Sequence, residues 1–270
     1  MNPKIGIVMP YFNRQEQLNR TLKSIENSSY KNIEIILVDD ASDIPVVLPK
    51  SIFYKYPIHL ITTPKAWKFW TSCAVIPYNS GISKALDLGS DIIVLQNPEN
   101  FHVGDVLSHV ASNTSEGVYS TYACFSLSKG QVDEKLAIAN QFGACSSGDL
   151  GWYNHSIHRP CYMEFFAAIT RKDMISLNGY DERFADGVAC GDCDLFRRVK
   201  NLGLRPEIID NPFVIHQWHY SGSNPYDDNI RFKRNQDLFY HLEKYDSGYR
   251  AQHIFTKDFD GTLDGYRQLH

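Results

Sequence analysis

The sequence predicts an α/β fold in which a mainly parallel sheet is flanked by helices. Two observations predict it: short apolar segments alternate with segments of helical periodicity through residues 4–95, and polar side chains directly follow three of the predicted strands. The chain has 270 residues, 43% of them hydrophobic, which is enough to bury a substantial core. Alternating strands and helices are typical of βαβ units, in which ligands bind beyond the carboxyl ends of the strands.

The first half contains the more regular pattern. Residues 4–9 predict a strand that ends at Pro10, and Asn13 is a candidate N-cap for a helix with Leu18, Leu22 and Ile25 on its apolar face. Further strands are predicted at residues 33–38, 58–62 and 91–95, with a helix at 81–88 before the last of them.

The second half is less regular. Strands are predicted at residues 119–125 and 165–170, and a helix at 194–202 that ends before Gly203. Residues 126–151 are rich in loop-forming residues. A polar helix is expected at 229–245, packing on the body through its few apolar side chains.

Composition excludes several classes of protein. The 27 Lys and Arg against 31 Asp and Glu give a net charge of −4, so a nucleic-acid partner is not expected. Apolar runs such as 35–38 and 92–95 fall far below the ~20 residues of a transmembrane helix. The start of the chain lacks the features of a signal peptide, which favours a cytoplasmic location, and the six cysteines are then expected as reduced thiols.

Five motifs occur in an order that identifies a family. They are Pro10-Tyr11-Phe12-Asn13-Arg14, Val38-Asp39-Asp40-Ala41-Ser42, Tyr78-Asn79-Ser80-Gly81-Ile82, Gly179-Tyr180-Asp181-Glu182-Arg183-Phe184 and Gly191-Asp192-Cys193-Asp194-Leu195. Over residues 4–220 this order resembles the family 2 glycosyltransferases. The resemblance implies a GT-A-type, Rossmann-like fold and an inverting transfer from a nucleotide-sugar, most typically UDP-linked, to a hydroxyl of a glycan or other acceptor.

The same resemblance implies a division of the chain. A single catalytic domain is expected over residues 1–222, with a nucleotide-binding half at about 1–95 and an acceptor half at about 96–222. Residues 223–270 are expected to form a helical tail that packs on this domain.

The expected nucleotide site lies at the ends of the predicted strands. A uracil ring offers one N–H donor and two carbonyl acceptors, so Asp40 is expected to accept the N–H while Tyr11 packs against the ring face. One of Asp39 and Asp40 is expected only to cap the next turn, and Asn79 is either a diphosphate contact or a helix N-cap. The predicted nucleotide-binding residues are Pro10, Tyr11, Asn13, Asp39, Asp40, Asn79, Gln96 and Asn97.

The expected metal site departs from the family pattern. Where the family usually has Asp-x-Asp, this chain has Gln96-Asn97-Pro98-Glu99. Glu99 is a candidate ligand for Mn²⁺ or Mg²⁺ from a position displaced by one residue, and the alternative is an exposed Glu after a turn. His216 and His219 are further candidate ligands, although either could instead be a packed core histidine. A structural zinc site built from His155, His158, Cys190 and Cys193 is disfavoured, because no second cysteine pair with zinc-finger spacing follows.

The expected catalytic base is Asp192. Asp192 and Asp194 point in different directions at the start of a helix, so only one of them can face the cleft. The family match assigns proton abstraction from the acceptor hydroxyl to Asp192 and a structural role to Asp194. The family more often has Glu before this Asp, where this chain has Gly191. Candidate sugar contacts are Trp152, Tyr153 and Trp218, of which Trp218 could equally be a core residue.

Two other functions remain compatible with the pattern. The first is a non-catalytic nucleotide-sugar or glycan-binding module that has lost turnover together with Asp-x-Asp. The second is a nucleotidyltransferase, which would be expected to carry a Gly-rich, basic loop after the first strand, where this chain has Tyr11-Phe12-Asn13. The motifs do not specify the donor sugar or the acceptor.

Overall fold

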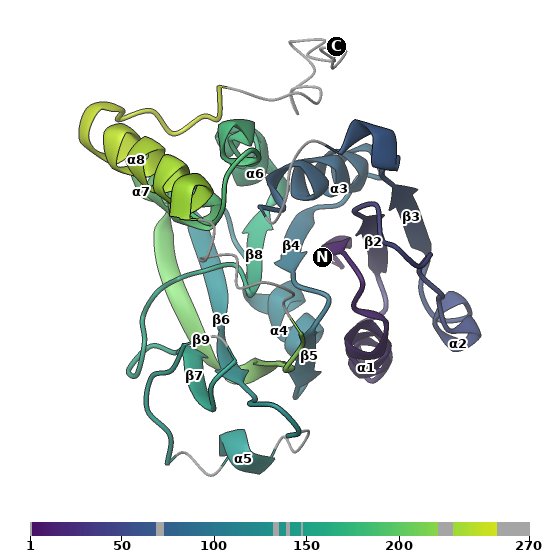
Figure 1. Ribbon diagram of the computed structural model, residues 1–270. Helices are drawn as coiled ribbons and strands as arrows, with labels where there is room; N and C mark the ends of the chain where they lie inside the picture. The colour runs from purple at the N-terminus through teal and green to yellow at the C-terminus, as the bar shows by residue number, and fades with distance from the viewer. Residues whose placement is uncertain are drawn as a thin grey trace.

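The fold is built on one nine-stranded sheet (Figure 1). The computed structural model describes residues 2–68, 73–131, 135–138, 141–146, 148–220 and 229–252. The strand order is β3-β2-β1-β4-β8-β6-β9-β5, and β7 pairs with β6. The strands are β1 Ile5–Tyr11, β2 Ile33–Asp39, β3 Ile58–Thr62, β4 Ile92–Gln96, β5 Asn100–Val103, β6 Val118–Ser126, β7 Gly151–Asn154, β8 Phe166–Thr170 and β9 Arg205–His216. The helices are α1 Gln15–Glu26, α2 Lys50–Phe53, α3 Val75–Asp87, α4 Val106–Asn113, α5 Lys135–Ile138, α6 Arg171–Leu177, α7 Gly191–Asn201 and α8 Asn229–Tyr245, with short 3₁₀ turns η1 Lys65–Trp67 and η2 Glu182–Phe184.

The first half of the sheet is parallel. β1 pairs in parallel with both β2 and β4, and β2 pairs in parallel with β3. Successive side chains of a strand point to opposite faces, so Val8 packs with α3 on one side while Ile7 packs with α1 on the other. Both faces are therefore covered, which explains why these strands read as nearly continuous apolar runs.

The second half of the sheet is mixed. β8 runs antiparallel to β4 and β6, β6 runs parallel to β9, and β5 runs antiparallel to β9. The last pairing sets Asn100 opposite His216, so the end of β9 returns to the turn that follows β4. The predicted fold class is confirmed, with the parallel order concentrated in β1 to β4.

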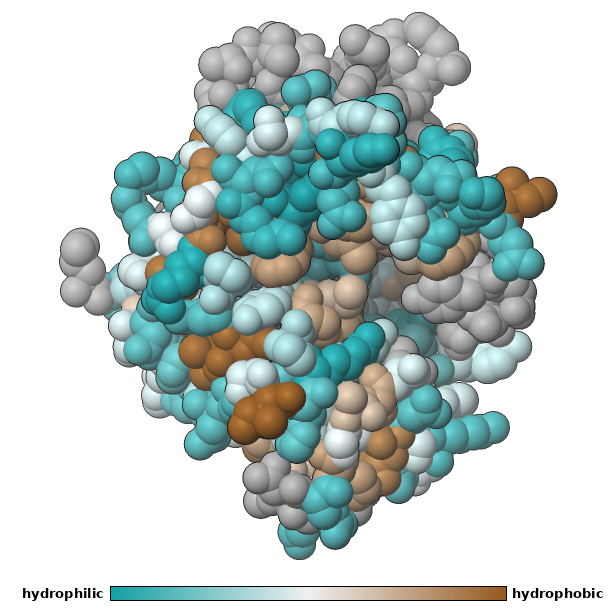
Figure 2. Space-filling view, turned by 90° about the vertical axis from the view of Figure 1, so that its left-hand side faces the viewer, coloured by the Kyte–Doolittle hydropathy of each residue, from teal (hydrophilic) through white to brown (hydrophobic). Residues whose placement is uncertain are grey.

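The predicted C-terminal helix is confirmed at Asn229–Tyr245. Leu242 is buried in the core that α3, α6 and α7 share, and Leu238 and Phe239 pack against that core. The part of the surface that carries α8 is largely hydrophilic, whereas apolar side chains gather in the lower half of the same face (Figure 2). Within the predicted tail, residues 223–228 and 253–270 lie outside the described residues, and the division of the chain into halves stays a prediction.

Two predicted helix starts are wrong. α1 begins at Gln15 with Arg14 at its N-cap, while Asn13 has a positive φ of 50° and exchanges two hydrogen bonds with Asp43. α3 begins at Val75, several residues before the predicted start, so Asn79 lies inside the helix and is not its N-cap. Among the described residues, no helix is both long and apolar enough to cross a membrane.

Candidate active site

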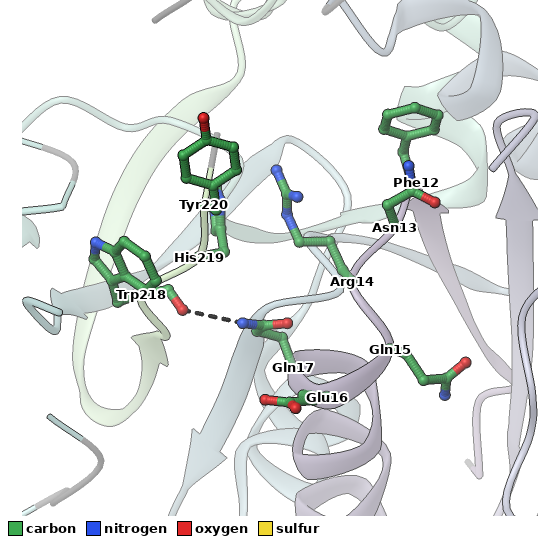
Figure 3. A pocket seen from close by; sticks show the side chains of 9 residues that line it. All are labelled: Phe12, Asn13, Arg14, Gln15, Glu16, Gln17, Trp218, His219 and Tyr220. Atoms are coloured by element: carbon green, nitrogen blue, oxygen red, sulfur yellow. Dashed lines mark hydrogen bonds between the residues drawn. The ribbon is translucent and has the colours of Figure 1, made fainter. Parts of the chain in front are cut away.

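A cavity of about 570 Å³ opens beside the carboxyl end of β1. Its walls are the loop into α1 and the residues after β9: Phe12, Asn13, Arg14, Gln15, Glu16, Gln17, Trp218, His219 and Tyr220 (Figure 3). The amide of Gln17 donates a 3.1 Å hydrogen bond to the carbonyl of Trp218, which ties the two walls together. Arg14 extends towards His219 and Tyr220, so the cavity has a cation and an imidazole for an anionic ligand.

The ends of β1 and β2 meet at the predicted nucleotide site. The Asp39 carboxylate accepts a 3.0 Å hydrogen bond from the backbone N–H of Ser42, so Asp39 is the member of the pair that caps the turn. The Asp40 carboxylate accepts a 2.9 Å hydrogen bond from Lys68, whose ammonium lies 4.2 Å from the ring centre of Phe12. Asp40 is only 6% exposed, and its assignment to the uracil N–H stays a prediction.

Three predicted nucleotide contacts are instead buried in the protein. Tyr11 is 2% exposed within the apolar core on the α1 side, so its ring cannot pack against a base. Asn79 is 0% exposed, and its amide bonds the backbone of Tyr180 and the carboxylate of Glu182. Gln96 is likewise 0% exposed and bonds Asn100 and His102. Polar side chains at strand ends were expected to face ligand, but these satisfy buried protein groups. Pro10, the residue before Tyr11, is also buried, within β1.

Glu99, His216 and His219 form a compact cluster of potential metal ligands. Their donor atoms lie within 4.8 Å of one another, and each histidine Nε2 is 3.5 Å from the same Glu99 oxygen. Burial by itself would raise the pKa of Glu99, but its interactions with His216 and His219 outweigh this and hold the pKa well below the usual range. Glu99 is therefore ionised, and the alternative of an exposed Glu is excluded, although the turn from Asn97 to Asn100 does form.

Gln217 holds this cluster in place. Its backbone N–H and its side-chain amide both donate to the carbonyl of Glu99, at 3.1 and 3.0 Å. The same amide also bonds the backbone of Gln17 in α1. Residues 216–219 are thus fixed to the turn after β4 and to α1, a link that the sequence motif alone did not indicate.

The predicted base lies in a second, smaller cavity. Asp192 is the second residue of α7 and lines a space of about 260 Å³ together with Tyr78, Asn97, Glu164 and Tyr180. Asn97 accepts a 2.8 Å hydrogen bond from the Tyr78 hydroxyl. Glu164 and Tyr180 were not predicted as site residues. Glu164 lies two residues before β8, and in the sequence a polar residue at such a position is typical of the end of a loop.

Asp194 has the structural role that was expected. Its side chain is buried, and its two oxygens accept hydrogen bonds from Arg197 and Arg198 at 2.7–3.1 Å. The two aspartates therefore face different surroundings, as helical geometry requires. This separation supports the choice of Asp192 as the residue that faces the cleft.

The candidate sugar contacts divide into three cases. Trp152 is 4% exposed and packs among Phe125 and Phe213, so the prediction of Trp152 as a sugar platform is wrong. Tyr153 is partly buried against Phe165, with its ring centre 5.8 Å from that of His216. Trp218 lines the larger cavity, so it is accessible to a ligand.

Comparison with known proteins supports the motif assignment. Residues 6–71 match the model of the family described as "Glycosyl transferase family 2". The start of this chain is therefore similar to that family. A β-1,3-glucosyltransferase of Campylobacter jejuni acting on GalNAc(5)-diNAcBac-PP-undecaprenol is 48% identical over 40 residues, 15% of this chain and 13% of that protein. An uncharacterized glycosyltransferase of Haemophilus influenzae is 33% identical over 110 residues, 39% of this chain and 40% of that protein.

Solved structures confirm the fold of this chain. Staphylococcus aureus TarS 1–349 in complex with UDP-GlcNAc has a TM-score of 0.58 and 12% identity, covering 90% of this chain and 67% of that one. The complex of TarS 1–349 with UDP has a TM-score of 0.57 and 11% identity, covering 80% of this chain and 60% of that one. The GT-A-type fold is thereby established. The chain spans less than half of the length of the curated relatives that it matches.

A zinc site of His155, His158, Cys190 and Cys193 gains no support, because Glu99, His216 and His219 form the only metal-ligand group in the described part of the chain.

Proposed function

We propose that this chain transfers a sugar from a nucleotide-sugar, with UDP as the nucleotide, to a hydroxyl group of a glycan acceptor, inverting the anomeric centre. The observation that carries the proposal is the position of the turn after β4. Asn97 in this turn lines the cavity of Asp192, and Glu99, two residues later, contacts His219, which lines the larger cavity. One short segment thus joins a candidate base to a candidate site for the leaving nucleotide.

This arrangement favours a single displacement. The acceptor hydroxyl would lose its proton to Asp192 as its oxygen bonds to the anomeric carbon, while the bond from that carbon to the diphosphate breaks. A base on one side of the anomeric carbon and a leaving-group site on the other give inversion. The UDP-bound state of TarS, a protein of the same fold, supports uridine as the nucleotide. Asp40 is the residue we assign to the uracil N–H, and Arg14 to the charge of the diphosphate.

The residues present fit a divalent metal. Two imidazoles and one ionised carboxylate are suitable ligands for Mn²⁺. The Nδ1 atoms of both His216 and His219 are buried with no hydrogen-bond partner among the described residues, so both rings have unused coordinating capacity. A bound metal would neutralise charge on the departing diphosphate. Glu99, His216 and His219 would hold it, and Gln217 would fix their mutual positions.

The test is an incubation of the protein with a panel of nucleotide-sugars, with Mn²⁺ or with EDTA, followed by mass spectrometry for free nucleotide. We expect UDP release from at least one UDP-sugar, even as slow hydrolysis without acceptor. Asp186→Asn, at an exposed site close in sequence to α7, is the matched control for Asp192→Asn. Binding of a UDP-sugar with no release under any condition would favour the non-catalytic module instead.

A further inference from the structure

The cavity of Asp192 contains a second carboxyl group. Glu164, just before β8, lines the same space of about 260 Å³, although it lies far from Asp192 in sequence. The described residues that line this cavity include no Lys, Arg or His. Two carboxylates that share a confined space without a cation repel each other, and one of them then retains its proton.

The surroundings indicate which carboxyl keeps the proton. Asp192 lies in the first turn of the 11-residue helix α7 and accepts a 2.8 Å hydrogen bond from the backbone N–H of Cys193. The helix N-terminus and this N–H both stabilise a negative charge on Asp192. Glu164 instead lies near Tyr78, Tyr119 and Tyr180, where burial and the charge of Glu164 raise the pKa of each tyrosine. Burial and the charge of Asp192 raise the pKa of Glu164 to about 8.

A second feature indicates that this pair faces a ligand. Tyr180 lines the cavity and is 1% exposed, and its hydroxyl has no hydrogen-bond partner among the described residues. A buried hydroxyl without a partner is costly, and a polar ligand group would satisfy it. A sugar hydroxyl that enters towards Asp192 would meet the Tyr180 hydroxyl and the Glu164 carboxyl in the same space.

We propose that Glu164 is a second carboxyl group of the acceptor site, which remains protonated while Asp192 is ionised and donates a hydrogen bond that positions the acceptor oxygen. During transfer the acceptor proton passes to Asp192 and Glu164 keeps its own, so the pair begins with one proton and ends with two until one is released to solvent. Gly191 stands where the family more often has Glu, and Glu164 supplies a carboxyl to this cavity from another element. The part of the proposal that concerns the acceptor rests on the proposed function, whereas the shared proton does not.

The shared proton can be measured without turnover. Carbon-13 NMR of the protein labelled at glutamate side-chain carboxyls should show one resonance that titrates near pH 8. This resonance should be absent in Glu164→Gln. It should titrate at lower pH in Asp192→Asn, which removes the neighbouring charge, and should be unchanged in the surface control Asp186→Asn. If no glutamate titrates near neutral pH, or if Asp192→Asn leaves the midpoint where it was, the proposal is overturned.

Stability gives a second readout of the same proton. A carboxyl whose pKa rises on folding from 4.5 to about 8 destabilises the folded state progressively as pH rises through this window. As pH rises from 4.5 to about 8, the melting temperature of the wild type should therefore decrease relative to that of Glu164→Gln. A constant difference across the window would contradict a protonated Glu164.

The role towards the acceptor is tested by the pH profile of transfer with the UDP-sugar that the nucleotide-sugar panel identifies. Glu164→Gln preserves a neutral hydrogen-bond donor, so it should retain activity at neutral pH and lose the fall in kcat/KM that the wild type shows above pH about 8. Glu164→Ala should be at least tenfold slower at all pH values. If Glu164→Gln abolishes transfer while Asp192→Asn does not, Glu164 is itself the base and the proposed roles are reversed. If no UDP-sugar turns over at all, the proposed function fails, while the NMR result still decides the shared proton.

Discussion

Asp192 and Asp194 are two residues apart on α7, but their side chains lie in different environments. Asp194 is enclosed by Arg197 and Arg198, whereas Asp192 lines a cavity. Asp192→Asn keeps the shape and the hydrogen bond to Cys193 but cannot accept a proton, so we expect transfer to fall ~10²–10⁴-fold. Initial rates of nucleotide release measure this. UDP affinity should stay unchanged, as should the rate of the control Asp186→Asn.

A purely structural Asp192 would behave differently. Asn is itself a good residue at a helix N-terminus, so in that case both stability and turnover would survive Asp192→Asn. Full activity in this variant, with activity lost in a folded Asp194→Asn, would show that the two roles are exchanged.

Glu99 supplies the carboxylate of the proposed metal site. Glu99→Gln removes the only carboxylate of the described cluster, so Mn²⁺ should strengthen UDP binding far less in this variant than in the wild type. In His219→Ala, Mn²⁺ should likewise strengthen UDP binding less than in the wild type. Isothermal titration with UDP, with Mn²⁺ or with EDTA, measures the difference. Glu116→Gln, at an exposed ion pair with Lys172, is the matched control. Identical UDP affinity in Mn²⁺ and EDTA would mean that the protein is metal-independent.

At the residue scale, the sequence indicated which side chains have suitable functional groups for a ligand, but not which of them are accessible to one. The sequence analysis named Glu99, His216 and His219 as candidate ligands, and the structure brings these three side chains together, while their binding of a metal stays a prediction. Trp152 and Asn79 were assigned to ligands because their side chains resemble ligand contacts, but neither side chain is accessible. A polar or aromatic side chain can be buried against protein groups that lie far away in the sequence, as Asn79 is against Tyr180, and the local sequence does not show this.

At the scale of elements, α4 shows how a cap can join two helices. The carboxylate of Asp105 accepts hydrogen bonds from the backbone N–H of Ser108 in α4 and from the hydroxyls of Ser28 and Ser29 after α1. Burial would raise the pKa of Asp105, but these hydrogen bonds outweigh it and lower the pKa well below its usual range. The ionised carboxylate therefore stabilises the fold.

We expect Asp105→Asn to lower the free energy of unfolding at pH 7 by about 1–3 kcal/mol, because hydrogen bonds to a charged group are lost. Since the folded pKa is depressed, this contribution is present above the unfolded value of ~3.9 and is lost as pH falls below it. Urea unfolding at neutral and acidic pH measures the change. Asp237→Asn, in an exposed pair with Lys233 on α8, should change stability by less than about 0.5 kcal/mol at either pH. A difference between wild type and Asp105→Asn that persists in acid would contradict this account.

Regular periodicity explains which elements the sequence could predict. β3 and α8 were predicted with their observed bounds, because apolar residues recur at strand or helix spacing and the flanks are polar. β9 extends from Arg205 to His216, although only residues 213–215 form an apolar run. Its first half is half-buried and pairs with β6, so tertiary pairing and not intrinsic pattern makes it a strand.

At the scale of the whole molecule, the turn after β4 connects the two candidate cavities: its Asn97 lines the smaller one, and its Glu99 contacts His219, which lines the larger one. The parallel strands supply the loops around Phe12 and Asp40, and the mixed strands return His216 to the same edge. The sequence predicted the first of these relations, because parallel strands place their carboxyl ends together. The second relation followed only from the family resemblance and not from the strand pattern, because the antiparallel pairing of β5 with β9 joins segments about a hundred residues apart.

Because the proposed nucleotide site is made of loops from several strands, nucleotide binding should stabilise the whole fold. A ligand that binds only the native state at 100 times its Kd stabilises it by about 2.7 kcal/mol. We expect UDP to raise the melting temperature more than ADP or GDP at equal concentration, since we assign the uracil N–H to Asp40. Differential scanning fluorimetry measures these shifts.

Asp40→Ala decides whether this preference comes from the assigned contact. The variant loses the acceptor for the uracil N–H and also the ion pair with Lys68, so its own melting temperature will differ and each nucleotide must be compared with the unliganded variant. We expect the advantage of UDP over GDP to shrink in Asp40→Ala and to remain in Asp87→Ala, an exposed site at the end of α3. If all three nucleotides shift the wild type equally, or if Asp40→Ala keeps the full preference for UDP, base recognition does not depend on Asp40.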